Sequence, residues 1–371
     1  MTAYSGLRAL NYSKISNLLM PKTFILPLTH IVRETPEAFT LVMDQPLVDR
    51  IAYLPGQYLT LKIDLNGKPH YRSYSISSTP GLDRYLAVTV KRLPGGLVSN
   101  YIHDHFEPGR LIEFLKPAGH FTLEPATSHE RHIALVGAGS GITPLMGILR
   151  ALLYGEPRSR VRLLYGSRDA KHVIFRDRLK ELQRQFPERL HVQHVLSQPQ
   201  PGTTLPHLSG RIDRAMLEQW QAEGQLVQPI EGYYLCGPEG LMRLAKETFV
   251  AHGADPTSIF TERFVATEEN TAAQQQIQGP TRWVELIIAD RTHRIQVPPG
   301  LSILQAAMAQ GLRLPYSCKR GICSTCMSKL LSGEIEMDNP ESLLPFEIEA
   351  GKVLTCQARP LTDDVKILVG G

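Results

Sequence analysis

The chain has 371 residues, of which 42% are hydrophobic and 20% are charged, and this length allows about two or three domains of ordinary size. Its net charge of +4 is too small to indicate a nucleic-acid-binding protein. No uninterrupted apolar run approaches the roughly 18 residues that a membrane-spanning helix needs.

Residues 1–26 are predicted to be an N-terminal extension ahead of the folded domains. The apolar segment 18–20 is too short for a secretory signal, so we expect a cytoplasmic protein. Apolar residues such as Leu7 and Leu10 stand among polar ones, which leaves two interpretations open. We favour a partly ordered extension over a short amphipathic docking helix, which would allow peripheral contact with a membrane.

Residues 27–127 are predicted to form an antiparallel β-barrel. Four strand-like segments lie at 39–43, 58–63, 85–90 and 111–114, and glycine- and proline-containing turns separate them. Short strands at such intervals are typical of antiparallel barrels.

Residues 128–266 change to alternating strands and helices. Strands are predicted at 133–136, 161–165, 190–195 and 232–236, with an apolar helix after the first and a second helix over 176–186. This alternation predicts a doubly wound α/β domain with a parallel sheet.

The polar, glutamine-rich stretch 267–281 is predicted to be an interdomain linker. The last domain, residues 282–371, begins with a predicted hairpin formed by 283–289 and 294–297. Ser302 is a candidate N-cap for a helix over 303–310.

Four cysteines near the C-terminus form the pattern C-x4-C-x2-C with one distant cysteine, which is typical of a plant-type [2Fe–2S] cluster. A structural zinc site would usually need a second C-x2-C pair, and a disulfide framework suits short secreted chains. The candidate ligands are Cys318, Cys323, Cys326 and Cys356.

Two segments of the predicted barrel favour a flavin site. In Arg72-Ser73-Tyr74-Ser75, an arginine can pair with phosphate, a tyrosine can lie against a flat ring, and serines can donate hydrogen bonds. Taken alone, this motif is explained equally well by a polar edge strand. The second segment is a glycine turn that enters a helix, where backbone N–H groups can bind a diphosphate. Its candidate residues, with the end of the preceding strand, are Val90, Lys91, Gly96, Leu97, Val98 and Ser99.

A glycine-rich turn, residues 137–144, follows the first strand of the α/β domain and predicts a dinucleotide site. A plain tight turn is the alternative. The candidate contacts are Gly139, Gly141, Thr143 and Pro144.

Ser167 and Arg168 follow the second strand of this domain, where ribose is usually bound, and can hold the 2′-phosphate of NADPH. The adjacent Asp169 weakens that preference over NADH.

Cys236-Gly237-Pro238 ends a later strand at the edge of the sheet where ligands bind. Cys236 is also explained as a small buried residue. Glu262 and Phe264 end the α/β domain, and Phe264 either shields the flavin or belongs to the core.

In this order, the motifs R-x-Y-S, G-x-G-x-G-x-x-P, C-G-P and the four cysteines resemble the ferredoxin–NADP reductase superfamily, with an added plant-type ferredoxin domain as in oxygenase reductases. The segments 315–326 and 333–338 are most similar to the epoxidase-reductase branch. The resemblance implies an α+β (β-grasp) fold for the last domain. It also implies NAD(P)H, a [2Fe–2S] cluster and a flavin, for which the glycine turn favours FAD over FMN, because FMN has no diphosphate to bind.

The resemblance implies an NAD(P)H-dependent reductase that passes single electrons to a partner such as a diiron hydroxylase, a fatty-acid desaturase or a Rieske oxygenase. It places Ser75, Cys236, Glu262 and Phe264 at the site of hydride transfer. Two alternatives stay open: a redox-sensing or docking module with an inactive nucleotide site, and a stand-alone oxidoreductase directed at quinone or O2.

Overall fold

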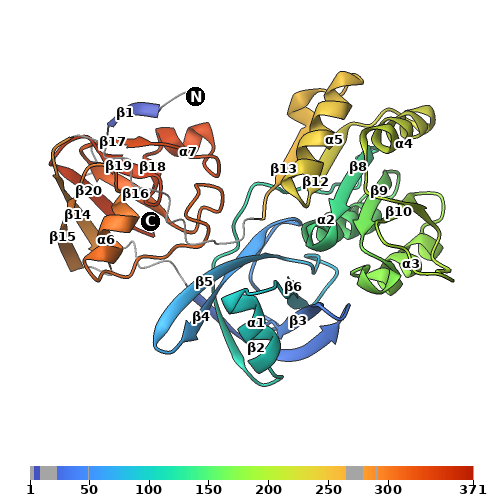
Figure 1. Ribbon diagram of the computed structural model, residues 1–371, viewed down its shortest axis with the longest axis horizontal. Coiled ribbons are helices and arrows are strands. Elements are labelled where there is room, and N and C mark those ends of the chain that lie inside the picture. The colour runs from blue at the N-terminus through green and yellow to red at the C-terminus, as the bar shows by residue number, and fades with distance from the viewer. Residues whose placement is uncertain (1–3, 9–22, 49, 265–278, 289–290, 371) are drawn as a thin grey trace.

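The computed structural model describes residues 4–8, 23–48, 50–264, 279–288 and 291–370. It has three domains (Figure 1): a β-barrel, an α/β domain and a C-terminal domain drawn in orange and red. The expected fold class, with a flavin-type β-barrel, a nucleotide-binding α/β domain and a ferredoxin domain, is confirmed. No helix within these ranges is long and apolar enough to cross a membrane.

The first domain is a curled six-stranded antiparallel sheet with the order β5-β4-β7-β2-β3-β6. An isolated bridge between Ile76 and Val88 brings the two ends of the sheet together. Apolar side chains that alternate along the strands fill the interior, among them Leu41, Leu61 and Phe114. The elements are β2 (Thr23–Arg33), β3 (Ala38–Asp44), β4 (Tyr58–Leu65), β5 (Lys68–Ser75), β6 (Tyr85–Lys91), α1 (Leu97–His105) and β7 (Leu111–Leu115).

The second domain contains a parallel six-stranded sheet with the order β11-β10-β9-β8-β12-β13. The strands are β8 (His132–Ala138), β9 (Arg160–Ser167), β10 (Leu190–Leu196), β11 (His207–Ser209), β12 (Gly232–Cys236) and β13 (Ile259–Glu262). The helices are η1 (Gly139–Gly141), α2 (Ile142–Gly155), η2 (Ala170–His172), α3 (Arg176–Gln185), α4 (Arg214–Val227), α5 (Glu239–Ala251) and η3 (Pro256–Ser258).

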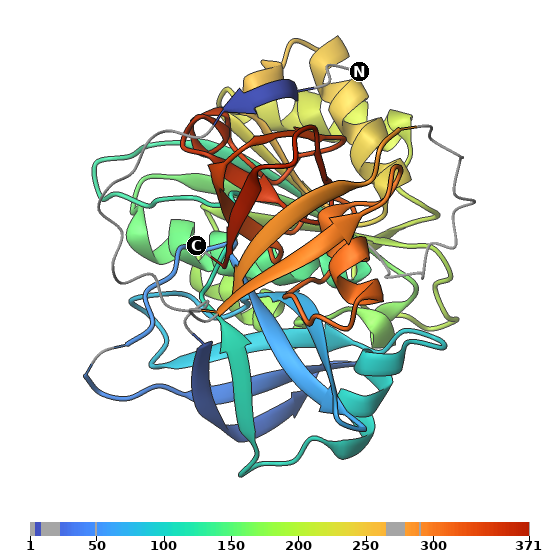
Figure 2. The ribbon, with the colours of Figure 1, turned by 90° about the vertical axis from the view of Figure 1, so that its left-hand side faces the viewer.

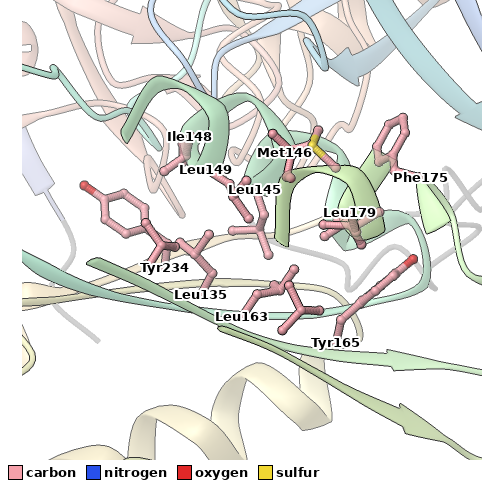
Figure 3. Close-up of a cluster of buried hydrophobic side chains, with 14 of the residues drawn as sticks. Leu135, Leu145, Met146, Ile148, Leu149, Leu163, Tyr165, Phe175, Leu179 and Tyr234 are labelled. Atoms are coloured by element: carbon pink, nitrogen blue, oxygen red, sulfur yellow. The ribbon is translucent and has the colours of Figure 1, made fainter. Parts of the chain in front are cut away.

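Helices cover both faces of this sheet because successive strand residues point to opposite sides. Leu135 and Leu163 pack against α2 and α3 on one face (Figure 3). On the other face, Ala134 and Leu164 pack against α4 and α5. The first of these cores also includes Ala38 and Phe121 of the barrel, so the two domains share buried apolar surface.

The third domain has its own core beneath two sheets, with the orders β15-β14-β20-β16-β18 and β1-β17-β19. The expected hairpin is present over the described residues, and Ser302 caps its helix by accepting a hydrogen bond from the N–H of Gln305. The elements are β14 (Arg282–Ile288), β15 (Arg291–Val297), α6 (Ile303–Ala309), β16 (Met327–Ser332), β17 (Glu334–Met337), α7 (Pro345–Glu349), β18 (Lys352–Leu354), β19 (Ala358–Pro360) and β20 (Val365–Val369).

The beginning of the chain lies against its last domain. Strand β1 (Tyr4–Arg8) pairs antiparallel with β17, which Figures 1 and 2 show as a blue arrow beside the red strands. Within residues 4–8 the chain is therefore a strand and not the docking helix that we considered. The rest of the extension, residues 9–22, and most of the expected linker, residues 267–278, lie outside the described residues.

Candidate cofactor sites

The motif Arg72-Ser73-Tyr74-Ser75 occupies the end of β5, where side chains alternate between two faces. Tyr74 packs partly buried against the barrel core, and burial raises the pKa of its hydroxyl. Nη1 of the half-buried Arg72 donates to the carbonyl of Tyr71 at 2.8 Å. Ser73 and Ser75 point the other way, towards residues of the two neighbouring domains. The motif thus lies on an edge strand of the sheet, and its polar side chains contact both neighbouring domains.

The glycine turn of the barrel enters α1 at Gly96, which occupies the N-cap position without a side-chain cap. A helix N-terminus of this kind fits the negative charge of a diphosphate. Leu97 is exposed, whereas Val98 and Ser99 are buried. Ser99 stabilises the turn, because its Oγ accepts a hydrogen bond from the N–H of Leu93 at 3.2 Å.

Val90 and Lys91 end strand β6. The side chain of Val90 is fully buried in the barrel core, so only its main chain is available to a ligand. Nζ of Lys91 lies 3.9 Å from the carboxylate of Glu37 and close to Gly139 of the second glycine turn. The end of β6, just before the glycine turn of the barrel, therefore approaches the nucleotide turn across the domain interface.

The nucleotide turn runs from β8 through η1 into α2. A Cβ at Gly141 would lie 2.0 Å from the carbonyl oxygen of Cys236, so only glycine allows this approach of the turn to strand β12. Oγ1 of the buried Thr143 donates to the carbonyl of Ser140 at 2.9 Å, and Pro144 lies in the first turn of α2. The hydroxyl of Tyr165 on β9 donates to the carbonyl of Gly139 at 2.9 Å, which fixes the turn against the sheet.

Three of the four residues expected at the site of hydride transfer come together. Cys236 and Glu262 are register partners on β12 and β13, and Oγ of Ser75 donates to Oε2 of Glu262 at 3.0 Å. Burial raises the pKa of Glu262 to about 8, although the hydrogen bond from Ser75 acts in the opposite direction. Burial also raises the pKa of the Cys236 thiol, and the nearby Glu262 carboxyl raises it further. Burial therefore favours the protonated forms of Glu262 and Cys236.

Gly237, Pro238 and Phe264 lie next to the cluster of Ser75, Cys236 and Glu262 in the chain. Gly237 follows β12 directly, and Pro238 occupies the N-cap position of α5. Phe264 is 43% exposed and lies two residues beyond Glu262, so it is not a core aromatic.

The expected ribose residues lie at the end of β9. Ser167 is buried, and Nη2 of Arg168 donates to both oxygens of Glu37 in the barrel, at 3.0 and 3.1 Å. Asp169 does not face Arg168, because its Oδ1 accepts from the N–H of Lys171 and contacts Nδ1 of His172, each at 2.8 Å. The Asp169 carboxylate is thus engaged within its own turn.

The four cysteines of the last domain are all buried, with exposed fractions of 3% to 9%. Backbone N–H groups already point at sulfur: Cys318 donates to Sγ of Cys323 and Arg320 donates to Sγ of Cys318, both at 3.3 Å. A Cβ at Gly321 would lie 1.7 Å from the carbonyl of Asn339, so this loop requires glycine. Four free cysteines with nearby N–H donors are the ligand types that a [2Fe–2S] cluster takes.

Sequence reasoning missed three residues that connect the domains: Glu37, Tyr58 and Thr60. Tyr58 and Thr60 on β4 contact the cysteine loop, and Glu37 contacts Arg168. Nothing in the local sequence distinguishes them from ordinary strand and turn residues, because their partners lie more than a hundred residues away.

Comparison with known families identifies three domains in the chain. Residues 26–123 match the oxidoreductase FAD-binding domain, residues 135–247 the oxidoreductase NAD-binding domain, and residues 286–361 the 2Fe-2S iron-sulfur cluster binding domain. The [2Fe–2S] interpretation therefore holds against the zinc and disulfide alternatives.

Two curated proteins match almost the whole chain. One component of the 1,2-phenylacetyl-CoA epoxidase of Escherichia coli (strain K12) is 35% identical over 92% of this chain and 96% of its own length. The ferredoxin reductase component of the 3-ketosteroid-9-alpha-monooxygenase of Rhodococcus rhodochrous is 34% identical over 93% of this chain and 97% of its own.

A solved structure shows that the whole three-domain fold has a precedent. Phthalate dioxygenase reductase, described as a modular structure for electron transfer from pyridine nucleotides to [2Fe-2S], has a TM-score of 0.56 at 22% identity and covers 94% of this chain and 97% of its own. The chain therefore belongs to the ferredoxin-reductase-type oxidoreductases with FAD-binding, NAD-binding and C-terminal 2Fe-2S domains, the family that includes the reductase components of oxygenases.

Proposed function

We propose that the chain takes electrons from NAD(P)H and delivers them singly to a partner oxygenase. When bound, FAD accepts a hydride and the [2Fe–2S] cluster carries one electron at a time. The observation that supports this function best is the pair of contacts that joins all three domains at one strand pair. Ser75 on β5 contacts Glu262 of the nucleotide domain, and Tyr58 on β4 contacts the cysteine loop.

The residues divide into the following proposed roles. Arg72, Tyr74 and Ser75 hold the flavin, and the N-terminal end of α1 holds its diphosphate. The turn 139–144 binds the diphosphate of the nucleotide. Ser75, Glu262 and Cys236 fix the ring that gives up the hydride, and Phe264 covers that position from the exposed side. We also propose that the flavin domain ends at residue 127, the nucleotide domain at residue 266 and the linker at residue 281.

The acceptor is proposed from the curated relatives, whose names connect them with an epoxidase and a monooxygenase. A diiron hydroxylase, a desaturase and a Rieske oxygenase are the candidate partners. The four thiolates of the cluster need a reducing compartment, which supports a cytoplasmic location.

Reconstitution tests the function. The purified protein is mixed with NAD(P)H and one purified candidate partner at a time, and reduction of the partner's metal centre is followed spectroscopically. We expect reduction of an oxygenase partner that depends on both nucleotide and reductase. A protein that consumes NAD(P)H only with quinone or O2, or not at all, would instead fit one of the two alternatives.

Nucleotide choice is proposed to favour NADPH through Arg168. Replacing Arg168 by Ala is expected to lower kcat/KM for NADPH about tenfold, the low end for a charge-assisted hydrogen bond, because this side chain is exposed and is already paired with Glu37. The value for NADH should change little. Arg176→Ala, which removes another exposed arginine of the same domain, is the matched control. A wild-type preference for NADH that Arg168→Ala leaves unchanged would refute the NADPH assignment.

A further inference from the structure

The loop that carries three of the four cysteines is hydrogen-bonded to strand β4 of the flavin barrel. The hydroxyl of Tyr58 donates to the carbonyl oxygen of Cys323 at 2.8 Å. The same hydroxyl contacts Oγ of Ser324 at 2.8 Å, and because its single proton is donated to Cys323, it accepts from Ser324. Two residues further along β4, Oγ1 of Thr60 contacts Oγ1 of Thr325 at 3.2 Å.

These side chains belong to one face of the strand pair that carries the flavin motif. Tyr58 pairs with Ser75 and Thr60 pairs with Ser73 in the β4–β5 ladder, so the four hydroxyl groups lie on the same side of the sheet. We call these four residues the hydroxyl face. Ser75 contacts Glu262 of the nucleotide domain, and Ser73 lies 3.5 Å from Oγ of Ser317, next to the first cluster cysteine. The hydroxyl face therefore contacts both the nucleotide domain and the cysteine loop.

Tyr58 is the best-fixed member of this face. Its side chain is buried, with an exposed fraction of 8%. Its main chain is held at both ends, because its N–H donates to the carbonyl of Ala118 at 3.0 Å and its carbonyl accepts from the N–H of Ala118 at 3.1 Å. The hydroxyl is thus presented to the cysteine loop by a rigid backbone and not by a mobile side chain.

Several other polar contacts between the ferredoxin domain and the barrel or the α/β domain are more exposed, including the hydrogen bond from Nη1 of Arg313 to the carbonyl of Gly67 at 3.2 Å. His120 lies 3.3 Å from Glu347, and Arg263 lies 3.4 Å from Glu341. Exposed ion pairs contribute little to docking, because water and salt screen them. The buried hydrogen bond from Tyr58 to Cys323 is therefore the polar link to the cysteine loop that is best shielded from water.

We propose that Tyr58 is a positioning residue that holds the cluster loop against the flavin strand and so sets the rate of electron transfer from flavin to cluster. This proposal rests on the proposed function. Tyr58 acts through the carbonyl of Cys323, a cluster ligand, so it fixes both the distance of the loop from the barrel and the hydrogen bonding around the cluster. Electron tunnelling slows steeply with distance, so a loosened loop transfers electrons more slowly.

The test uses the full-length, cofactor-loaded protein and its Tyr58→Phe variant, which keeps the ring and removes only the hydroxyl. Under anaerobic mixing with NADPH, we expect flavin bleaching at the wild-type rate and cluster reduction slowed about fivefold, the effect of one lost hydrogen bond. Two readouts do not depend on turnover. The amide protons of the segment 317–326 should exchange faster, and the cluster's electron paramagnetic resonance spectrum should change.

Tyr71→Phe is the matched control, because it removes a hydroxyl from the same strand pair at a position that pairs with Lys62 of the barrel. It should behave as wild type in all three measurements. A Tyr58→Phe protein with wild-type cluster reduction, amide exchange and cluster spectrum would overturn the proposal. If that variant fails to load its cofactors, Thr60→Val decides the matter in the same assays. Failure of the proposed function would appear differently, as a wild-type cluster that NADPH never reduces.

Discussion

Replacing Cys323 by Ser is expected to remove the [2Fe–2S] cluster while leaving the flavin bound. A serine hydroxyl is a poor ligand for iron compared with a thiolate, and the buried loop offers no other soft donor at this position. The flavin residues belong to a different domain with its own core, so the barrel should keep its cofactor. Iron and acid-labile sulfide analysis, together with the visible absorption spectrum, measures both outcomes.

Cys236→Ser is the control for this substitution. Cys236 is the fifth free cysteine, is fully buried, and ends a strand of the α/β domain. Its variant should retain the iron and sulfide of the wild type, whatever it does to hydride transfer. If the Cys323→Ser protein kept a full complement of iron and sulfide, the assignment of this residue as a ligand would be wrong.

Removing the ferredoxin domain is expected to abolish most electron transfer to one-electron protein acceptors without unfolding the reductase. The barrel and the α/β domain share a core that includes Ala38 and Phe121, whereas the last domain has a separate core. A fragment of residues 23–266 should therefore bind FAD and reduce ferricyanide with NAD(P)H. It should reduce cytochrome c far more slowly than the full chain does.

Starting the fragment at residue 23 also removes β1, whose partner strand β17 is lost with the ferredoxin domain. A fragment that misfolds or loses flavin would show that the domain boundary is misplaced. A fragment that supports undiminished turnover with O2 or quinone would favour the stand-alone oxidoreductase.

The features that the sequence predicted are those whose cause is local. The cysteine spacing, the turn around Gly141 and the N-cap at Ser302 each depend on residues close in the chain. The same holds for the strand periodicity of the barrel and for the alternation of strands and helices in the α/β domain. Each of these elements appears in the structure near its expected position.

The missed features are contacts between residues far apart in the chain. The strand at 4–8 has no apolar alternation that marks it, and its pairing with β17 becomes visible only in three dimensions. The role of Asp169 was open for a different reason, because its side chain turns to Lys171 and His172, two and three residues ahead, and not to its neighbour Arg168. Tyr58 reads as an ordinary apolar strand residue until the cysteine loop is placed against it.

Anaerobic stopped-flow reduction of the wild-type protein by NADPH tests the central claim most directly. A protein with the two iron atoms of a [2Fe–2S] cluster should first lose flavin absorption and then cluster absorption, and the reduced cluster should give an electron paramagnetic resonance signal. This order follows because the nucleotide domain reaches the flavin strand through Ser75 and the cluster loop reaches it through Tyr58. Zinc in place of iron, or a cluster that stays oxidised after the flavin is reduced, would contradict the account.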